Sequence, residues 1–224
     1  MTDKLLISLC GNIVTFYFTG LSNIWAHEQA YNNKNIYPLQ DIGFKLIDYN
    51  RNYLYYNDYV LGALLLVVFV FLGFQKNRKE IILRWSIMLN ILFMMRIIMI
   101  PSTILTRPVE IYEKWGCKTE GYDYNGLFGP FEIIFQNKMT CYDFIFSGHM
   151  VNTCICILIL IKYLQHKSKY LLWLICIVEA FFIIITRSHY LIDINVAIVL
   201  TILIWIILEQ REKNMELTPN IHIV

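Results

Sequence analysis

The chain has 224 residues, of which 57% are hydrophobic and only 16% are charged, well below the quarter that soluble domains typically carry. Its apolar residues gather into blocks instead of following a helical or strand period, which favours one polytopic membrane domain over one or two soluble domains. A formal net charge of +2, with no run of five basic residues, excludes nucleic acid as a partner.

Six stretches are candidate membrane helices, because crossing a hydrocarbon core of about 30 Å takes roughly 17 to 25 residues. Backbone groups in lipid must be hydrogen-bonded internally, so each stretch is expected to be helical. The predicted fold is all-α, with one six-helix domain over residues 1–224 and a flexible cytosolic tail over residues 209–224. The first stretch is expected to be an uncleaved anchor. The predicted spans are Leu5–Trp25, Tyr59–Phe74, Ile81–Leu105, Phe144–Leu164, Tyr170–Thr186 and Tyr190–Leu208.

Charges in the loops predict the orientation of these spans. The loop over residues 75–84 carries four basic residues against Glu80 alone, and the loop over residues 162–170 carries lysines and no acid. The positive-inside rule places both in the cytosol. The long loops over about 26–58 and 106–143 hold more acids than bases and are expected on the other side, which leaves both termini cytosolic.

Two histidines stand on the outer side of this topology. His149 lies about one turn and a half into the fourth span, and His189 lies in the turn before the last span. Asp193 follows His189 by four residues, a spacing that makes side chains neighbours on one helical face. Such a carboxylate can fix the tautomer of the imidazole, an arrangement that suits a histidine nucleophile. Each motif alone is common, but their coincidence at one side of the membrane indicates an active site.

Four segments resemble motifs of the sphingomyelin synthase family. Residues 141–149, CYDFIFSGH, resemble its C-G-D-[FY]-x-F-S-G-H-T motif, and residues 189–194, HYLIDI, resemble its H-Y-[ST]-[IV]-D-V motif. The segment YPLQD at residues 37–41 is similar to the P-L-P-D segment after the family's first span, and Arg96 matches an arginine within its third span. The chain departs from these motifs at Tyr142 for glycine, Met150 for threonine and Gln40 for proline.

The resemblance implies a helical core like that of the lipid phosphate phosphatases and a head-group transfer reaction. Family members move a phosphorylated head group from a glycerophospholipid to the primary hydroxyl of ceramide and release diacylglycerol. His189 would be the nucleophile that forms a phosphohistidine, Asp193 would orient its ring, and His149 would act as general acid and then general base. The scheme implies no metal and no cofactor. The residues expected to bind substrate are Asp143, Ser147, Gly148, Arg96, Asp41 and Tyr190.

Particular roles follow for two of these residues. Asp143 would attract a choline or ethanolamine cation, while Arg96 would contact the phosphate, because guanidinium forks match phosphate oxygens. The alternative for Arg96 is a structural pairing with Glu179 inside the bundle. The implied partners are phosphatidylcholine or phosphatidylethanolamine, ceramide and diacylglycerol, with a homodimer as a further candidate. The choice among choline, ethanolamine and inositol stays open.

Two other functions compete with this one. Lipid phosphate phosphatases share the three catalytic residues but add K-x6-R-P and S-R-x5-H. Arg107 and Pro108 are present, yet the lysine position holds Ile100, and the Ser-Arg positions hold Phe182 and Ile183. A phosphatase or a phospholipase C-like hydrolase is therefore less favoured. The third alternative is a non-catalytic membrane scaffold or transporter.

The predicted outer loop also carries Cys117 and Cys141, which are expected to form a disulfide because that side of the membrane is oxidising. The active site is expected to face the lumen or the exterior. In a eukaryotic cell this corresponds to the Golgi or the plasma membrane.

Overall fold

The computed structural model of the protein describes residues 2–32, 38–105, 126–134, 144–164 and 167–217. Throughout these residues the secondary structure is helical, with no strand, which confirms the predicted all-α class. Two short helices, α2 (Ile42–Leu46) and α6 (Gly129–Ile134), and the 3-10 turns at Arg51–Tyr53, Gly126–Phe128 and Lys167–Leu172 lie between the longer ones. The six longer helices are α1 (Thr2–Asn32), α3 (Tyr56–Phe74), α4 (Arg78–Ser102), α7 (Gly148–Tyr163), α8 (Trp173–Ile185) and α9 (Leu191–Leu217).

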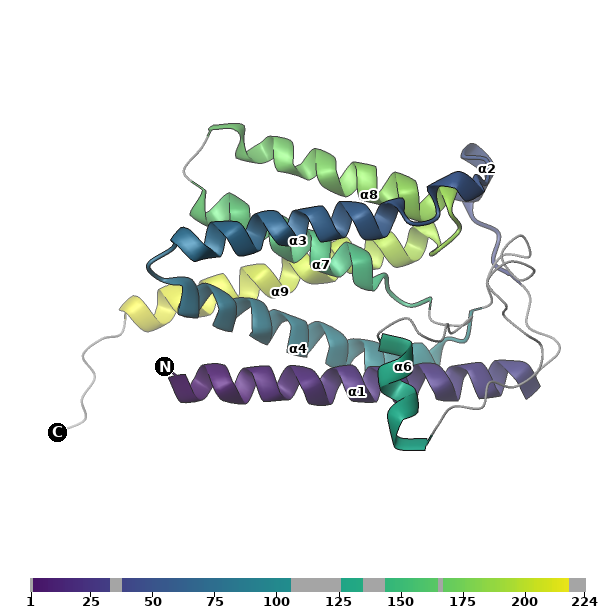
Figure 1. The fold of residues 1–224 in the computed structure, drawn as a ribbon, viewed down its shortest axis with the longest axis horizontal. Coiled ribbons are helices and arrows are strands. Elements are labelled where there is room, and N and C mark those ends of the chain that lie inside the picture. The colour runs from purple at the N-terminus through teal and green to yellow at the C-terminus, as the bar shows by residue number, and fades with distance from the viewer. Residues whose placement is uncertain (1, 33–37, 106–125, 135–143, 165–166, 218–224) are drawn as a thin grey trace.

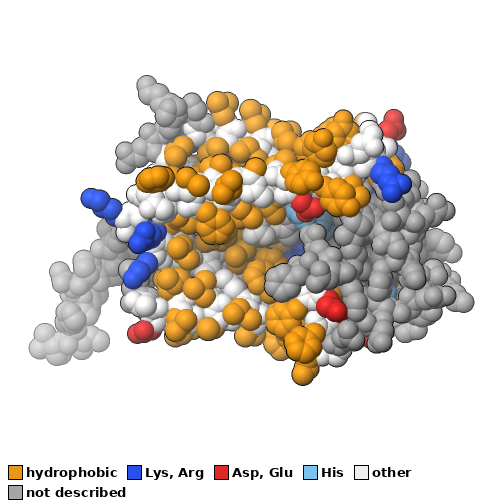
Figure 2. All heavy atoms as spheres, in the orientation of Figure 1, with side chains coloured by type: hydrophobic (Ala, Val, Ile, Leu, Met, Phe, Trp, Pro, Cys, Tyr) orange, Lys and Arg blue, Asp and Glu red, His pale blue; other side chains and the backbone are white. Residues whose placement is uncertain are grey.

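The longer helices lie side by side and alternate in direction (Figure 1). We call the end of the bundle at which α3, α7 and α9 begin the motif end, because it carries both histidine motifs. At the opposite end α1 and α4 begin and α9 ends. Apolar side chains cover the middle of the visible face, with Lys and Arg near its ends (Figure 2), a distribution typical of an integral membrane protein.

Four helical stretches are long and apolar enough to cross a membrane, namely Thr2–Ala30, Arg51–Phe74, Arg78–Ser102 and Leu191–Asn214. Helices α7 and α8 have 16 and 13 residues. At 1.5 Å per residue they extend only about 24 and 20 Å, less than a hydrocarbon core of about 30 Å. The membrane class is confirmed, whereas the predicted total of six spans stays a prediction.

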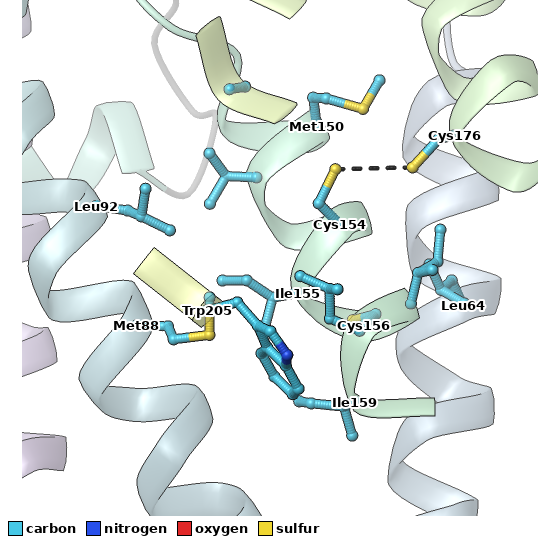
Figure 3. Packing of buried hydrophobic residues seen from close by; sticks show 14 of the residues in the cluster. Leu64, Met88, Leu92, Met150, Cys154, Ile155, Cys156, Ile159, Cys176 and Trp205 are labelled. Atoms are coloured by element: carbon cyan, nitrogen blue, oxygen red, sulfur yellow. Dashed lines mark hydrogen bonds between the residues drawn. The ribbon is translucent and has the colours of Figure 1, made fainter. Parts of the chain in front are cut away.

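Helix α7 is the centre of the bundle, because it packs against α3, α4, α8 and α9. Its Ile155, Ile157 and Ile159 are completely buried, as are Met88 and Leu92 of α4. Figure 3 shows Ile155 and Ile159 among residues of the neighbouring helices. Almost every residue of α7 from Met150 to Leu160 is buried by these neighbours, so α7 holds the Ser-Gly-His segment within the bundle at the motif end.

Two predicted boundaries were wrong. Helix α7 begins at Gly148 instead of Phe144, because the Ser147 side chain caps it by accepting a hydrogen bond from the Met150 N–H at 3.3 Å. His149 is therefore the second residue of the helix and not a turn and a half inside. Helix α9 continues to Leu217, so residues 209–217, assigned from the sequence to a flexible tail, are helical.

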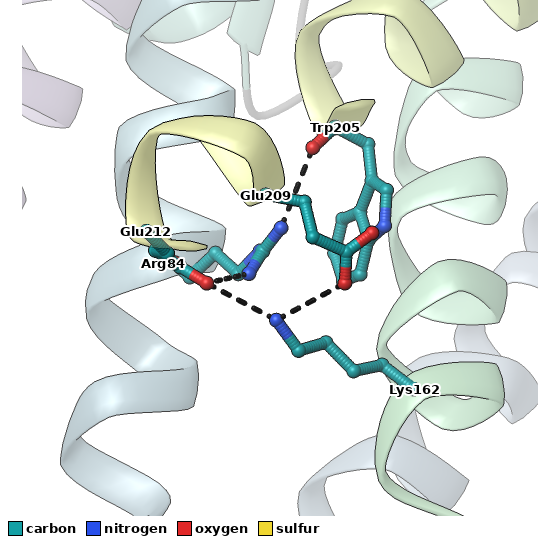
Figure 4. A network of polar contacts seen from close by, with 5 residues as sticks. All are labelled: Arg84, Lys162, Trp205, Glu209 and Glu212. Atoms are coloured by element: carbon teal, nitrogen blue, oxygen red, sulfur yellow. Dashed lines mark hydrogen bonds and ion pairs between the residues drawn. The ribbon is translucent and has the colours of Figure 1, made fainter. Parts of the chain in front are cut away.

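Charged residues explain the extension of α9 (Figure 4). The buried guanidinium of Arg84 binds the Glu212 carboxylate at 2.5 Å and stacks on the Trp205 ring at 4.0 Å. Lys162 of α7 binds Glu209 at 3.3 Å and Glu212 at 3.1 Å. These contacts clamp the last turns of α9 to α4 and α7 at the opposite end of the bundle.

Removing the Glu212 charge is expected to destabilise this clamp. The variant Glu212→Gln leaves Arg84 buried without its carboxylate, which costs about 2 kcal/mol of unfolding free energy. Denaturation of the purified protein in detergent measures the loss. The matched control is Lys162→Met, which removes a partly exposed ammonium from the same carboxylate and should cost less than about 1 kcal/mol. Equal losses in the two variants would contradict the dominant role of the buried Arg84.

A seam of polar side chains joins α1 to α4. Ser86 on α4 bonds Ser8 and Asn12 on α1, each at 2.8 Å, and Asn90 donates to the Ser8 carbonyl at 2.8 Å. Thr15 donates to the Asn90 side chain at 3.3 Å. Small polar residues of this kind hold helices together in lipid, where apolar contact gives little net attraction between helices. Helix α1 is therefore fixed by hydrogen bonds more than by an apolar core.

Candidate active site

The two histidine motifs meet at the motif end of the bundle. The backbone N–H of Ser147, just before α7, donates to the backbone carbonyl of Asp193 in the first turn of α9 at 3.3 Å. The ring of Phe144 lies 5.8 Å from the ring of His189, edge to face. A backbone hydrogen bond and a contact between two rings thus fix the Ser-Gly-His segment against the His-Tyr-Leu-Ile-Asp segment.

His189 and Asp193 are neighbours, although not on a helical face. Helix α9 begins at Leu191, so His189 precedes it. The Asp193 carboxylate reaches back to the N–H of Tyr190, where Oδ2 accepts a hydrogen bond at 2.9 Å, and the same oxygen lies 3.5 Å from His189 Nδ1. Asp193 is the third residue of α9, and its bond to the N–H of the residue before the helix is one of the two hydrogen bonds of a capping box. The Asp193 side chain is fully buried. Because Nδ1 of His189 is turned toward Asp193, Nε2 is the ring nitrogen that can react with a substrate.

His149 has an acidic partner that the sequence did not reveal. Its Nε2 lies 2.7 Å from Oδ1 of Asp58, in the first turn of α3. The side chains are 24% and 37% exposed, so this pair is open to the exterior of the bundle, unlike the more buried pair of His189 and Asp193. A carboxylate only accepts, so Nε2 is the donor and Nδ1 is left for a substrate. The motif end therefore holds two His-Asp pairs.

The sequence contained one weak signal for Asp58. It stands at the start of a predicted span on the same side as both histidines. Acids in the first turn of a helix are common, however, because they interact favourably with the positive end of the helix dipole. The residue is separated from His149 by 91 positions, and no local pattern links the two.

Arg96 supports the Ser-Gly-His segment from α4. Its guanidinium is buried and donates to the backbone carbonyl of Phe146. A β-carbon placed on Gly148 would lie only 3.2 Å from Arg96 Nη1, which explains why the residue before His149 has no side chain. The alternative pairing with Glu179 is not observed, since among the described residues Glu179 takes part in no ion pair.

Asp41 and Tyr190 hold a loop against the start of α9. Asp41 caps α2, where Oδ1 accepts from the Gly43 N–H at 2.7 Å, and its Oδ2 accepts from the Leu191 N–H at 2.6 Å. The Tyr190 hydroxyl accepts from the Leu39 N–H at 3.2 Å, and its side chain is completely buried. These contacts are structural. The predicted contact of Asp41 and Tyr190 with substrate stays a prediction.

The remaining predicted residues lie outside the described part of the chain. These are Asp143, the residue expected to meet the head-group cation, and the expected disulfide partners Cys117 and Cys141. Tyr142 and the Arg107-Pro108 dipeptide are also outside it.

The chain is also similar in sequence to known proteins. Residues 140–210, which contain both histidine motifs, match the protein family described as PAP2 superfamily C-terminal. The chain is 27% identical over 202 residues to the Caenorhabditis elegans protein named "Putative phosphatidylcholine:ceramide cholinephosphotransferase 3", a match that covers 83% of this chain and 58% of that protein. It is 25% identical over 203 residues to phosphatidylcholine:ceramide cholinephosphotransferase 1 of the same organism, which covers 85% of this chain and 41% of that protein.

The chain thus spans about half the length of these curated relatives. The similarity nevertheless runs over most of the chain and is not restricted to the two motifs. It confirms the resemblance to the sphingomyelin synthase family, with its relation to the lipid phosphatases, that the motifs predicted.

Proposed function

We propose that the protein is a phospholipid:ceramide head-group transferase. It moves phosphocholine or phosphoethanolamine from a glycerophospholipid to the primary hydroxyl of ceramide and releases diacylglycerol. The observation that carries the proposal is the pair of His-Asp contacts at one end of a membrane bundle, His189 with Asp193 and His149 with Asp58. The names of the two relatives support the choice of substrates.

The first half-reaction transfers the head group to the protein. His189 Nε2 attacks the phosphorus, an N–P bond forms, and the P–O bond to diacylglycerol breaks. His149 gives the departing alkoxide a proton from Nδ1, since its Nε2 is bound to Asp58. Asp193, 3.5 Å from His189 Nδ1, stabilises the positive charge that develops on the ring.

The second half-reaction transfers the head group to ceramide. His149 accepts the proton of the ceramide primary hydroxyl, the hydroxyl oxygen attacks phosphorus, and the N–P bond to His189 breaks. Both histidines return to their starting states, so donor and acceptor use one site in turn. Water in place of ceramide gives a phospholipase C-like hydrolysis by the same steps, which is the alternative function.

The basic loop at the opposite end of the bundle supports an orientation in which the motif end faces the lumen or the exterior. The donor then comes from the outer leaflet. In a eukaryotic cell this orientation corresponds to the Golgi or the plasma membrane.

The proposal is tested with purified protein in vesicles that contain ceramide and a phospholipid labelled in its head group. We expect the label to appear in a sphingolipid, with one diacylglycerol released for each transfer. Label released mainly as water-soluble phosphocholine or phosphoethanolamine would favour the hydrolase. Neither product above the level of empty vesicles would favour the scaffold.

A further inference from the structure

A carboxylate that the mechanism does not use lies within the bundle. Glu179 is in the middle of α8 and is completely buried, on the same stripe as the buried Cys176 and Ile183. In the described part of the chain neither of its carboxylate oxygens has a hydrogen-bond partner. Burying a polar group without a partner costs free energy of folding, so this residue calls for an explanation other than packing.

The packing of α7 against α8 sets the level of Glu179 along the bundle axis. The sulfurs of Cys154 on α7 and Cys176 on α8 are 3.7 Å apart (Figure 3). The two helices are antiparallel. Glu179 lies three residues, about 4.5 Å, closer to the motif end than Cys176, and His149 lies five residues, about 7.5 Å, closer to it than Cys154. Glu179 therefore lies about 3 Å deeper than His149 along the bundle axis.

Glu179 also lies near Asp58, the acid of the open His-Asp pair. Helices α3, α7 and α8 pack against one another, and Glu179 lies close enough to Asp58 on α3 for the two carboxylates to interact electrostatically. Asp58 and His149 are partly exposed, whereas Glu179 is completely buried on the inner side of this pair.

The charges at this place favour a cation. Two acids, Asp58 and Glu179, lie near a single histidine, and no lysine or arginine within the described ranges forms an ion pair with either acid. A zwitterionic phospholipid carries its ammonium group a few bonds from the phosphorus that His189 attacks. Phosphate at the histidines therefore places a positive charge within reach of the acids, and a head group without a cation leaves them unneutralised.

We propose that Glu179, together with Asp58, binds the ammonium group of the donor head group. This inference rests on the proposed function, since it assigns the donor's phosphate to the two histidines. The shared ligand is an alkylammonium ion, which choline and ethanolamine both supply, while glycerol and inositol head groups do not.

The test compares head groups in a binding measurement that needs no turnover. Short-chain phosphatidylcholine, phosphatidylethanolamine and phosphatidylglycerol are titrated calorimetrically into the detergent-solubilised wild type, Glu179→Gln and Glu209→Gln. We expect the wild type to bind at least one of the first two lipids about tenfold or more tightly than phosphatidylglycerol, since a charge-assisted contact is worth about 10- to 100-fold. Glu179→Gln should abolish this preference. Glu209→Gln, which changes a carboxylate at the opposite end, should keep it.

Each outcome decides the inference. If Glu179→Gln loses the preference for only one of the two zwitterionic lipids, Glu179 binds the head group of that lipid. If it loses the preference for both, Glu179 binds the ammonium group that they share. A wild type without any preference, a Glu179→Gln variant that keeps it, or equal weakening toward all three lipids overturns the inference. If Glu179→Gln does not purify as a folded protein, Glu179→Met serves in its place, because it removes the charge and fills a similar volume.

Transfer assays on the same samples separate this inference from the proposed function. A preference that Glu179→Gln abolishes in a protein without transfer activity supports the cation site and overturns the transferase. Transfer to ceramide by a protein whose head-group preference does not depend on Glu179 does the reverse.

Discussion

The variant His189→Ala is expected to lose head-group transfer by at least about 10³-fold, because no other group near Asp193 replaces the nucleophile. Substrate binding should change little, since the imidazole contributes its bond to phosphorus only during the reaction. The measurement is a single turnover with phospholipid labelled in its head group. The reaction is quenched before ceramide is added, and the label bound to the protein is counted. Wild type should retain acid-labile, alkali-stable label of the kind that phosphohistidine gives, and His189→Ala should retain none.

The matched control is His222→Ala, a histidine that the sequence places in the C-terminal tail. It should keep wild-type transfer and wild-type labelling. Label that stays on the protein in His189→Ala would assign the nucleophile to another residue, whereas transfer without label in the wild type would replace the covalent intermediate by direct attack of ceramide.

The variant Asp58→Asn is expected to lower kcat by about 10²- to 10⁴-fold and to leave folding intact. Asparagine keeps the size of the side chain but removes the charge that holds His149 Nε2 at 2.7 Å, and its amide donor can reverse the tautomer of the ring. The effect should fall on both half-reactions, so label should reach His189 slowly and leave it slowly. Rapid-mixing single-turnover experiments measure the rate at which label reaches His189 and the rate at which ceramide removes it, in the variant and in the wild type.

Asp48→Asn is the control for this prediction. It removes one negative charge from the same predicted outer segment, without contact to His149 among the described residues, and should leave both rates unchanged. If Asp58→Asn slows neither half-reaction, the Asp58 contact is structural and His149 acts without an acidic partner.

The sequence was sufficient for features that depend on neighbouring residues. Blocks of apolar residues predicted the helices, because satisfying the backbone in lipid leaves few alternatives. The four-residue spacing correctly predicted that His189 and Asp193 are neighbours, although a helix cap brings them together and not a helical face. Ser147 was visible in the sequence as a residue type that caps helices, yet the apolar residues before it suggested an earlier start of α7.

Features that depend on distant residues could not be predicted in the same way. Asp58 meets His149 across 91 positions, and Arg84 meets Glu212 across 128. Charged residues after Leu208 look like a solvated tail until their partners on α4 and α7 are known. Long-range pairing of charged side chains depends on the packing of the whole bundle, which composition and periodicity do not contain.

The polar seam between α1 and α4 has a consequence for the synthesis of the protein. Asn12 and Ser86, which bond in the seam, are 74 positions apart. At about 5 to 20 residues per second, the ribosome makes Ser86 about 4 to 15 s after Asn12. During that interval the serine, asparagine and threonine face of α1 has no partner helix. We therefore expect α1 to stay with the membrane insertion machinery for several seconds, until α4 supplies its polar partners.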